Sequence, residues 1–455
     1  MRETAQAVGS RLAEEKQKIA AKPRIFVSSE IKGDFRAQLG TAHYSYRLVA
    51  ERFCDAFRRR GYQPALVDMP EKFKRPVDLR LGFGDGPGTP VHIAFRSTEN
   101  LRPMRAAAVN ICHFAWEFDV LKDRELISGP ITANQKHMLS LMDEIWVPCS
   151  YTRDTLLRYG LDRVEVVPTP VCGNELPERL SKAEALAAIG HVAAAPLAYS
   201  NGLSRPLNAE MVAAAIDSLG NFPAVGAWLE GRGRIFLTVC NPHDLRKNLP
   251  NLIDGFLYAA GPDDLLLVKF VVSGGGTFLD DDLFEHLAKR YRGPIAMYAP
   301  NVLVISEYLD ERQMSALYSM ADFYLSGSHC EGFNLPLLEA MGCGALPVTT
   351  RNTAMCDYID EKNAIVIAER GFPGPVPGMT SDAAGISAVI SVADRFDIAR
   401  AVRMAQQMAP DAYAAMASRG RPLVMERYSE AAVMGLAEAR LGALRALRSE
   451  ERDAV

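Results

Sequence analysis

The sequence predicts an α/β fold built from two doubly wound, Rossmann-like domains that face each other across a cleft. The chain has 455 residues, of which 48% are hydrophobic, and this length favours two domains of about 200 residues each. Short apolar segments with strand character alternate with amphipathic helical segments, which is typical of a parallel sheet covered by helices on both faces. The alternation occurs twice, on either side of a segment of different composition at residues 173–232.

The first alternation defines an N-terminal domain at residues 1–172. A helix at residues 44–62 has apolar residues at helical spacing, and a shorter helix at residues 151–160 ends in a glycine. Strands are expected at residues 23–30, 63–68, 91–95, 106–114, 144–150 and 164–171.

The intervening segment, residues 173–232, is rich in Ala, Pro and Gly. It contains helical patterns at residues 181–190 and 208–220, so a linker with a helical insertion is expected.

The second alternation defines a C-terminal domain at residues 233–426. A last helix is expected at residues 427–450, for which Ser429 is a suitable N-cap. Strands are predicted at residues 233–241, 264–276, 301–309 and 321–328, with helices at 248–260 and 311–320 and a further helix that starts near Asn334 within the segment 334–350.

Charge and cysteine content narrow the class of protein. A net charge of -4 argues against a nucleic-acid binder, whereas residues 1–110 carry more Lys and Arg than Asp and Glu, which suits an anionic acceptor or a membrane surface. A solvated charged face explains the same excess. The eight cysteines lack C-x-x-C spacing, the first residues lack the apolar core of a signal peptide, and no apolar run is long enough to span a membrane. These features predict a cytoplasmic protein.

The stretch HCEGFNLPLLEAMGCG, residues 329–344, places Glu331 and Glu339 around the expected start of a helix. Asn334 can cap this helix, and Pro336 fits its first turn, where a missing N–H costs nothing. The free N–H groups of a helix start form an anion site, and a carboxylate accepts hydrogen bonds from a sugar diol. A nucleotide sugar would satisfy both, whereas a capping glutamate and a solvated helix glutamate would explain the same spacing without a ligand.

Three segments together resemble the family 4 retaining glycosyltransferases. Residues 308–350 are similar to the E-x7-E segment of that family, residues 244–256 to its phosphate-binding stretch, and residues 143–171 to the end of its N-terminal domain. The resemblance implies a GT-B fold, with the acceptor on the first domain and the nucleotide sugar mainly on the second. It also implies that the last helix crosses back to the first domain.

The resemblance implies roles for individual residues of the second domain. Glu339 would hold the ribose hydroxyls, Glu331 would contact the donor sugar, and Lys247 with Arg246 would neutralise the departing diphosphate. The remaining donor contacts would come from Gly332, Phe333, Asn334, Leu335 and the segment that ends at Tyr308.

The resemblance extends to the first domain with less detail. His113 stands at a strand end where the family often places a histidine that faces the donor sugar. Trp116 and Glu117 resemble a W-E pair of a family subset and could contact a sugar, and Gly40 resembles an acceptor-side glycine loop. Ordinary packing is the alternative for each. The family's G-R pair is absent, since Cys240 and Asn241 stand at about that place.

The expected activity is transfer of a hexose-type sugar from a nucleotide sugar to a saccharide or lipid-linked acceptor, with no cofactor, no metal and no nucleic acid. Assembly of bacterial surface polysaccharide or glycolipid, with peripheral membrane association, fits this expectation. One alternative is a metal-dependent GT-A transferase that uses the D-x-D of residues 280–282, although helix capping explains those aspartates. Others are a catalytically silent GT-B partner that binds sugar, or another GT-B enzyme such as a nucleotide-sugar epimerase or a phosphorylase.

Overall fold

The structure is a computed structural model of the chain. It describes the following residues: 22–29, 42–84, 88–122, 131–173, 179–192, 194–200, 225–229, 233–242, 244–271, 296–375 and 387–453. Gly40, the helical pattern at 208–220 and the D-x-D at 280–282 therefore lie outside the described residues.

The first domain is a six-stranded parallel sheet with the order β2-β1-β3-β4-β5-β6. Its strands are β1 (Arg24–Ser29), β2 (Ala65–Leu66), β3 (Pro90–Phe95), β4 (Val109–His113), β5 (Glu144–Val147) and β6 (Val164–Val166). Its helices are α2 (Ala42–Arg59), α3 (Pro76–Phe83), α4 (Gln135–Ser140) and α5 (Ser150–Arg158), with single turns η2 (Pro70–Lys72), η3 (Thr98–Asn100) and η4 (Ile131–Ala133). This order belongs to the doubly wound folds, as predicted.

The second domain contains a seven-stranded sheet with the order β13-β12-β11-β8-β9-β10-β7. Its strands are β7 (Ala195–Ser200), β8 (Ile235–Cys240), β9 (Leu265–Phe270), β10 (Ala296–Ile305), β11 (Phe323–Ser326), β12 (Leu346–Thr349) and β13 (Ile365–Val366). Without β7, the order is that of a Rossmann sheet whose direction of winding reverses between β8 and β11. Ligands of such sheets bind beyond the carboxyl ends of the strands at this switch point.

The helices of the second domain cover both faces of this sheet. They are α6 (Lys182–Ile189), α8 (Val225–Leu229), α9 (Leu249–Ala259), α11 (Glu311–Met320), α12 (Leu335–Gly342), α13 (Arg395–Gln407), α14 (Pro410–Ala417) and α15 (Gly420–Tyr428), with turns η5 (Leu245–Lys247) and η6 (Thr353–Asp357). Two apolar clusters form the core, one on each side of the sheet.

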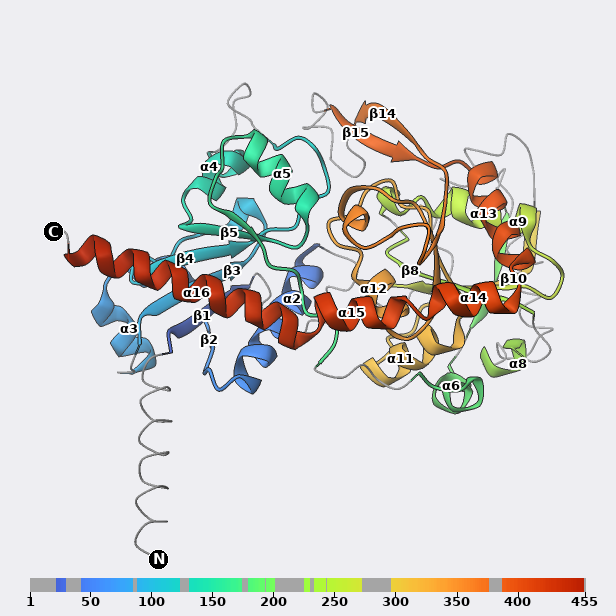
Figure 1. The fold of residues 1–455 in the computed structure, drawn as a ribbon, viewed down its shortest axis with the longest axis horizontal. Helices are drawn as coiled ribbons and strands as arrows, with labels where there is room; N and C mark the ends of the chain where they lie inside the picture. Colours follow the sequence, from blue (N-terminus) through green and yellow to red (C-terminus); the bar gives the residue numbers. More distant parts are fainter. Residues whose placement is uncertain are drawn as a thin grey trace, which may run out of the picture.

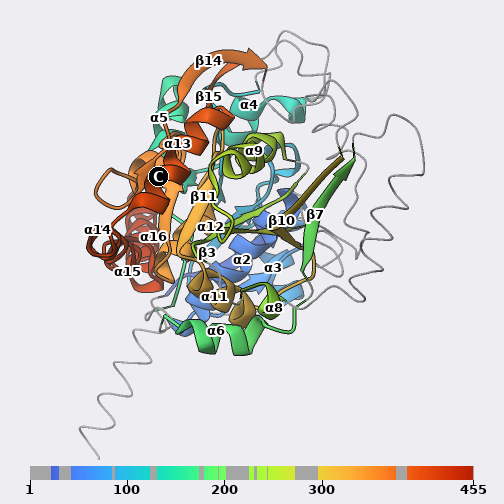
Figure 2. The ribbon, with the colours of Figure 1, turned by 90° about the vertical axis from the view of Figure 1, so that its right-hand side faces the viewer.

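Part of residues 173–232 belongs to the second sheet. The strand β7 pairs antiparallel with β10 at the edge of that sheet, and Figure 2 shows the two strands side by side. The helix α6 buries Ala185 and Ile189 in the same apolar cluster as α11. The sequence predicted a linker and a helical insertion here and did not predict the edge strand.

The last helix, α16 (Glu430–Asp453), crosses back over the first domain, as the resemblance implied (Figure 1). Its apolar face packs Val433, Met434, Ala437 and Leu441 into the core of that domain. Ser429 caps the helix, because its hydroxyl accepts a hydrogen bond from the Ala432 N–H at 3.3 Å. The chain thus connects the two domains twice.

A separate hairpin, β14 (Arg370–Pro375) with β15 (Ser387–Val392), is not part of either large sheet. It follows β13 and lies near α5 of the first domain (Figure 1). All eight cysteines lie in the described part of the chain and are free thiols.

Candidate active site

The loops that follow β8 and β11 meet at the switch point of the second sheet. The first loop carries Arg246 and Lys247, and the second carries Glu331. They are joined directly, since the His329 N–H donates to the Arg246 carbonyl at 2.8 Å. These loops therefore bring together residues that are 84 positions apart in the chain.

Both helices that begin here start at an asparagine in the left-handed backbone region. Asn248 before α9 has φ 54° and Asn334 before α12 has φ 60°, a conformation that asparagine tolerates better than most residues. The Asn248 side chain donates to the Gly327 carbonyl at 3.0 Å and so ties the first loop to the second. Each asparagine turns the chain sharply from strand to helix.

Asn334 does not cap α12 in the predicted way. It occupies the N-cap position, but its side chain makes no capping hydrogen bond and instead approaches the Met355 sulfur at 3.4 Å. Among the described residues, the N–H groups of Gly332, Phe333 and Leu335 donate to no acceptor, and Pro336 lies in the first turn. The helix start therefore retains the free N–H groups expected of an anion site.

Lys247 and Glu331 form a buried ion pair. The Lys247 ammonium lies 2.7 and 2.8 Å from the two carboxylate oxygens of Glu331, whose side chain is 5% exposed. Burial alone would lower the pKa of the Lys247 ammonium, but the Glu331 and Asp244 carboxylates offset this effect and raise the pKa above its usual value. Lys247 is therefore charged at neutral pH.

Arg246 is paired with two carboxylates. Its guanidinium donates to Asp244 at 2.6 and 2.9 Å and to Glu117 of the first domain. Burial would lower the pKa of the guanidinium, but Glu117 and Asp244 raise it well above its usual value. Burial raises the pKa of the Glu117 carboxyl, and Arg246 only partly counters that effect.

The cluster thus contains three carboxylates and two cations. A diphosphate that binds here brings further negative charge, so it must compete with Glu117 for Arg246. Glu117 comes from the first domain, whereas Asp244 and Glu331 belong to the second. A change in the spacing of the domains would therefore release Arg246 from Glu117, while Asp244 would keep its hydrogen bonds to Arg246.

Glu339 also bridges the domains. Its carboxylate accepts a hydrogen bond from Arg52 of α2 at 2.5 Å and another from the Tyr318 hydroxyl at 2.8 Å. Tyr44 lies near Glu339 and Tyr308, and burial, followed by these two neighbours, raises the pKa of Tyr44 to about 12. Tyr308 is 42% exposed. The predicted ribose site is therefore lined by groups from both domains.

His113 lies in the core of the first domain, at the end of β4. It is 2% exposed, and its Nε2 lies 3.0 Å from the Val167 carbonyl, which fixes the ring proton on Nε2. Burial lowers the pKa of His113 to about 4. The histidine is neutral at neutral pH, and its ring is stacked on Phe95.

Trp116 is packed rather than open to the cleft. The indole is 9% exposed, stacks on Phe114 with centroids 5.8 Å apart and meets Phe118 edge-on at 5.2 Å. Its N–H donates to the Val120 carbonyl at 2.8 Å. This position leaves the indole little surface for stacking on a sugar, so of the W-E pair only Glu117 reaches the charged cluster.

The sequence did not single out Arg52, Asp244, Tyr318 or Thr353. Asp244 stands two positions before Arg246, so the D-x-R-K order was a usable signal for it. Arg52 is 287 positions from its partner Glu339, and no local pattern marks such a pair. Thr353 accepts the Glu331 N–H at 2.8 Å and has a positive φ of 46°, which the sequence does not reveal.

Two properties of the described residues concern metal binding and membrane spans. No group of three or more His, Cys, Asp or Glu side chains in them could hold a metal ion. None of their helices is long and apolar enough to cross a membrane.

A family model described as Glycosyl transferases group 1 matches residues 233–374. The matched segment contains Arg246, Lys247, Glu331 and Glu339, so it covers the whole second-domain part of the candidate site. No match was found among curated proteins.

Several solved structures share the fold over nearly the whole chain. Sucrose-phosphate synthase from Thermosynechococcus elongatus is 15% identical, with a TM-score of 0.56, and the match covers 93% of this chain and 100% of that chain. The α,α-trehalose-phosphate synthase (UDP-forming) from Burkholderia xenovorans, in complex with glucose-6-phosphate, is 10% identical, with a TM-score of 0.53 and coverage of 93% and 100%. A trehalose-6-phosphate protein from E. coli bound with UDP-2-fluoro glucose is 10% identical, with a TM-score of 0.52 and coverage of 92% and 98%. These likenesses confirm the predicted GT-B fold.

Proposed function

We propose that the protein is a retaining glycosyltransferase that moves a hexose-type sugar from a nucleotide-sugar donor to an acceptor hydroxyl. One observation carries the proposal: Lys247 and Glu331 meet at the switch point of the second sheet, beside the N–H groups of Gly332, Phe333 and Leu335, which donate to no acceptor among the described residues. This point lies inside the segment that matches the group 1 glycosyltransferases. A cation and a helix start suit a diphosphate, and a carboxylate suits sugar hydroxyls.

In the proposed reaction the bond between the anomeric carbon and the diphosphate oxygen breaks, and a bond to the acceptor oxygen forms on the same face of the sugar. The acceptor proton passes to an oxygen of the departing diphosphate. Lys247, Arg246 and the start of α12 stabilise the charge that develops on this leaving group. Glu331 orients the sugar and Glu339 the ribose. No protein nucleophile is part of this scheme, so a trapped glycosyl-enzyme would contradict it.

The acceptor is proposed to be a saccharide or a lipid-linked saccharide of bacterial surface polysaccharide or glycolipid assembly. The basic excess of residues 1–110 supports an acceptor presented at the inner face of the cell membrane. The structural neighbours support a nucleotide-sugar donor, because one of them is bound with UDP-2-fluoro glucose. The reaction is proposed to need no metal, since Lys247 and Arg246 supply the positive charge.

The test is release of nucleoside diphosphate from a panel of UDP-, GDP- and ADP-sugars, with and without saccharide acceptors and with chelator present. We expect release from one donor, abolition of release in Lys247→Met, and a product whose anomeric configuration, read by NMR, equals that of the donor. Inversion would refute retention, and loss of activity with chelator would refute metal independence.

A second candidate, a catalytically silent sugar-binding partner with a GT-B fold, is favoured by one observation. Lys247, Arg246 and Glu339 already have internal partners. The same assay separates the candidates, because a silent partner would bind a nucleotide or sugar without releasing diphosphate from any donor.

A further inference from the structure

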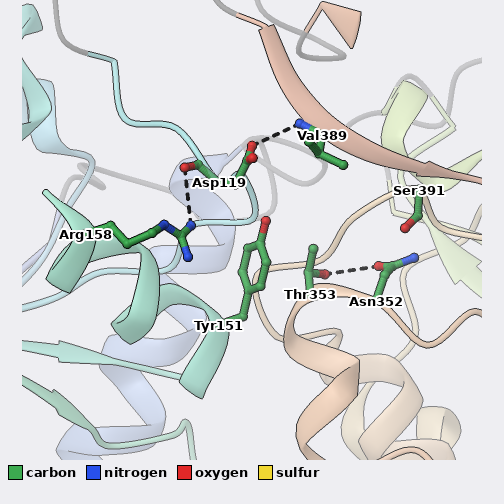
Figure 3. Close-up of a pocket in the computed structure, with 7 residues that line it drawn as sticks. All are labelled: Asp119, Tyr151, Arg158, Asn352, Thr353, Val389 and Ser391. Atoms are coloured by element: carbon green, nitrogen blue, oxygen red, sulfur yellow. Dashed lines mark hydrogen bonds between the residues drawn. The ribbon is translucent and has the colours of Figure 1, made fainter. Parts of the chain in front are cut away.

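A cavity of about 400 Å³ lies between the two domains, beside the loop that carries Glu331 (Figure 3). Its volume falls in the usual range for small-molecule sites. The first domain and the second domain each supply one wall. The lining residues are Asp119, Tyr151, Arg158, Asn352, Thr353, Val389 and Ser391.

The cavity shares its second-domain wall with the candidate active site. The Glu331 N–H donates to the Thr353 hydroxyl at 2.8 Å, while the Glu331 carboxylate binds Lys247. The neighbouring His329 is joined to Ser391 by a contact of 2.7 Å between its Nδ1 and the Ser391 carbonyl. Glu331 therefore connects the cavity wall at Thr353 with Lys247 of the candidate active site.

The second-domain wall is held in place by its own contacts. Asn352 donates to the Ser328 carbonyl at 3.0 Å and to Glu369 at 2.7 Å. Thr353 holds a positive φ of 46°, which is unfavourable for a β-branched residue and is found mostly where the surroundings enforce it, often at functional sites. The hairpin is fixed to the first domain, because the Val389 N–H donates to the Asp119 carboxylate at 3.0 Å. Because these residues are already held in place, ligand binding would cost little conformational entropy in this wall.

The lining chemistry suits a neutral, polyhydroxylated ligand. Asp119 and Arg158 supply one charge of each sign, so the lining has no excess that would favour an anion. The Asp119 carboxylate and the Asn352 amide oxygen can accept hydrogen bonds, and the Tyr151 hydroxyl can donate one. The Tyr151 ring stands between the two walls in Figure 3. Among the described residues the Tyr151 hydroxyl has no hydrogen-bond partner. An aromatic ring with surrounding polar groups is the combination that a pyranose requires.

We propose that this cavity, between α5 and the β14–β15 hairpin, binds a neutral saccharide and serves as an acceptor subsite. The proposal rests on the proposed transferase function, because only a transfer reaction uses an acceptor. It assigns Tyr151, Asp119 and Asn352 as saccharide-binding residues. It also gives the β14–β15 hairpin the role of forming part of the cavity wall, through Val389 and Ser391.

The experiment reads saccharide binding and nucleotide binding separately. Saturation-transfer NMR measures binding of methyl α-glucoside, mannose and N-acetylglucosamine, with and without saturating nucleotide, and thermal shift measures binding of UDP, GDP, ADP and their sugars. Val389→Trp fills the cavity while it keeps the backbone bond to Asp119, and Val389→Ala is its control. Tyr151→Phe removes only the hydroxyl, and Tyr258→Phe, on the exposed surface of α9, is its control.

We expect Val389→Trp to abolish the saccharide signal and Tyr151→Phe to weaken binding about tenfold. Both variants should keep the nucleotide shift, which also shows that they fold, and both controls should behave like the wild type. A saccharide signal that survives Val389→Trp, or a wild type that binds nucleotide but none of the saccharides, would overturn the acceptor subsite and leave the proposed function intact. If the wild type binds saccharide in this cavity but responds to no nucleotide or nucleotide sugar, the transferase function fails and the saccharide site stands.

Discussion

At the residue scale, the Lys247–Glu331 pair is the feature on which the proposed chemistry depends, and we expect it to affect stability as well. Neither charge is well solvated, since the side chains are 19% and 5% exposed. Removing one partner from a buried pair leaves the other charge without compensation, and this costs more than the pair itself contributes.

We therefore expect Glu331→Gln to lower the free energy of unfolding by about 3 kcal/mol and to remove turnover. The double variant Glu331→Gln with Lys247→Met should recover much of the stability but no activity. Urea denaturation of the two single variants and the double variant gives the coupling energy. A coupling energy near zero would contradict the buried pair.

His113 provides a pH test at the same scale. Burial lowers its pKa from 6.5 to about 4, and burial also lowers that of His92 to about 4. Between these values the folded protein binds fewer protons than the unfolded chain, so stability decreases as the pH falls from 6.5 toward 4. Ring-nitrogen NMR at pH 5.5 should show His113 neutral, with its proton on Nε2. A ring that titrates near 6.5 would show that His113 faces solvent.

At the scale of elements, the sequence predicted the strand and helix order because hydrophobic periodicity is local. It predicted Ser429 as a cap for the same reason. It did not predict β7, whose residues APLAYS contain a proline and alanines and become a strand only through pairing with β10, about 100 positions later. It also misassigned the capping role of Asn334, since a backbone turn in the left-handed region replaces the side-chain cap.

The candidate site follows the same division. Lys247, Arg246 and Glu331 could be predicted because each lies in a short motif that follows the carboxyl end of a strand. Glu117, which binds Arg246, and Arg52, which binds Glu339, could not be ranked from the sequence, because domain docking decides which of these charges meet. Asp244 had a usable signal in the D-x-R-K order, since it stands two positions before Arg246. The cavity beside α5 has no local signature for the same reason, as its lining comes from four separate segments.

An ion pair between Arg440 and Glu144 attaches the crossing helix α16 to the first domain. Arg440 lies 2.5 Å from Glu144, whose buried carboxylate also accepts the Trp146 N–H. We expect Arg440→Ala to lower the free energy of unfolding by about 2 kcal/mol, less than for a fully buried pair, because Arg440 is 33% exposed. Arg58→Ala, which breaks an exposed pair with Asp55, is the control and should change stability by less than about 0.5 kcal/mol. Equal effects in urea denaturation would show that Glu144 is solvated.

At the scale of the whole molecule, two ion pairs connect the domains across the candidate site. Arg52 binds Glu339 on one side, and Glu117 binds Arg246 on the other. Both pairs use groups that the proposed donor would need, so the charges of the proposed nucleotide site are neutralised by internal partners. Donor binding must then exchange at least one pair for contacts to the nucleotide.

Removal of the competing carboxylate should therefore favour the ligand. We expect Glu117→Gln to strengthen binding of nucleoside diphosphate about tenfold, because Arg246 loses one of its two competing carboxylates and one negative charge is removed from the cluster. Glu339→Ala should weaken binding instead, since it removes the predicted ribose contact. Isothermal titration measures both, and tighter binding in Glu339→Ala would reverse the assigned roles.

The most direct test of the central claim, that the switch point of the second sheet is a nucleotide-sugar site, is a thermal-shift panel. UDP, GDP, ADP, CMP and their common sugars would be compared on the wild type and on Lys247→Met. We expect one nucleotide, at 100 times its dissociation constant, to add about 2.7 kcal/mol of stability to the wild type and little to the variant. Equal stabilisation of both proteins, or no stabilisation by any member of the panel, would contradict the site.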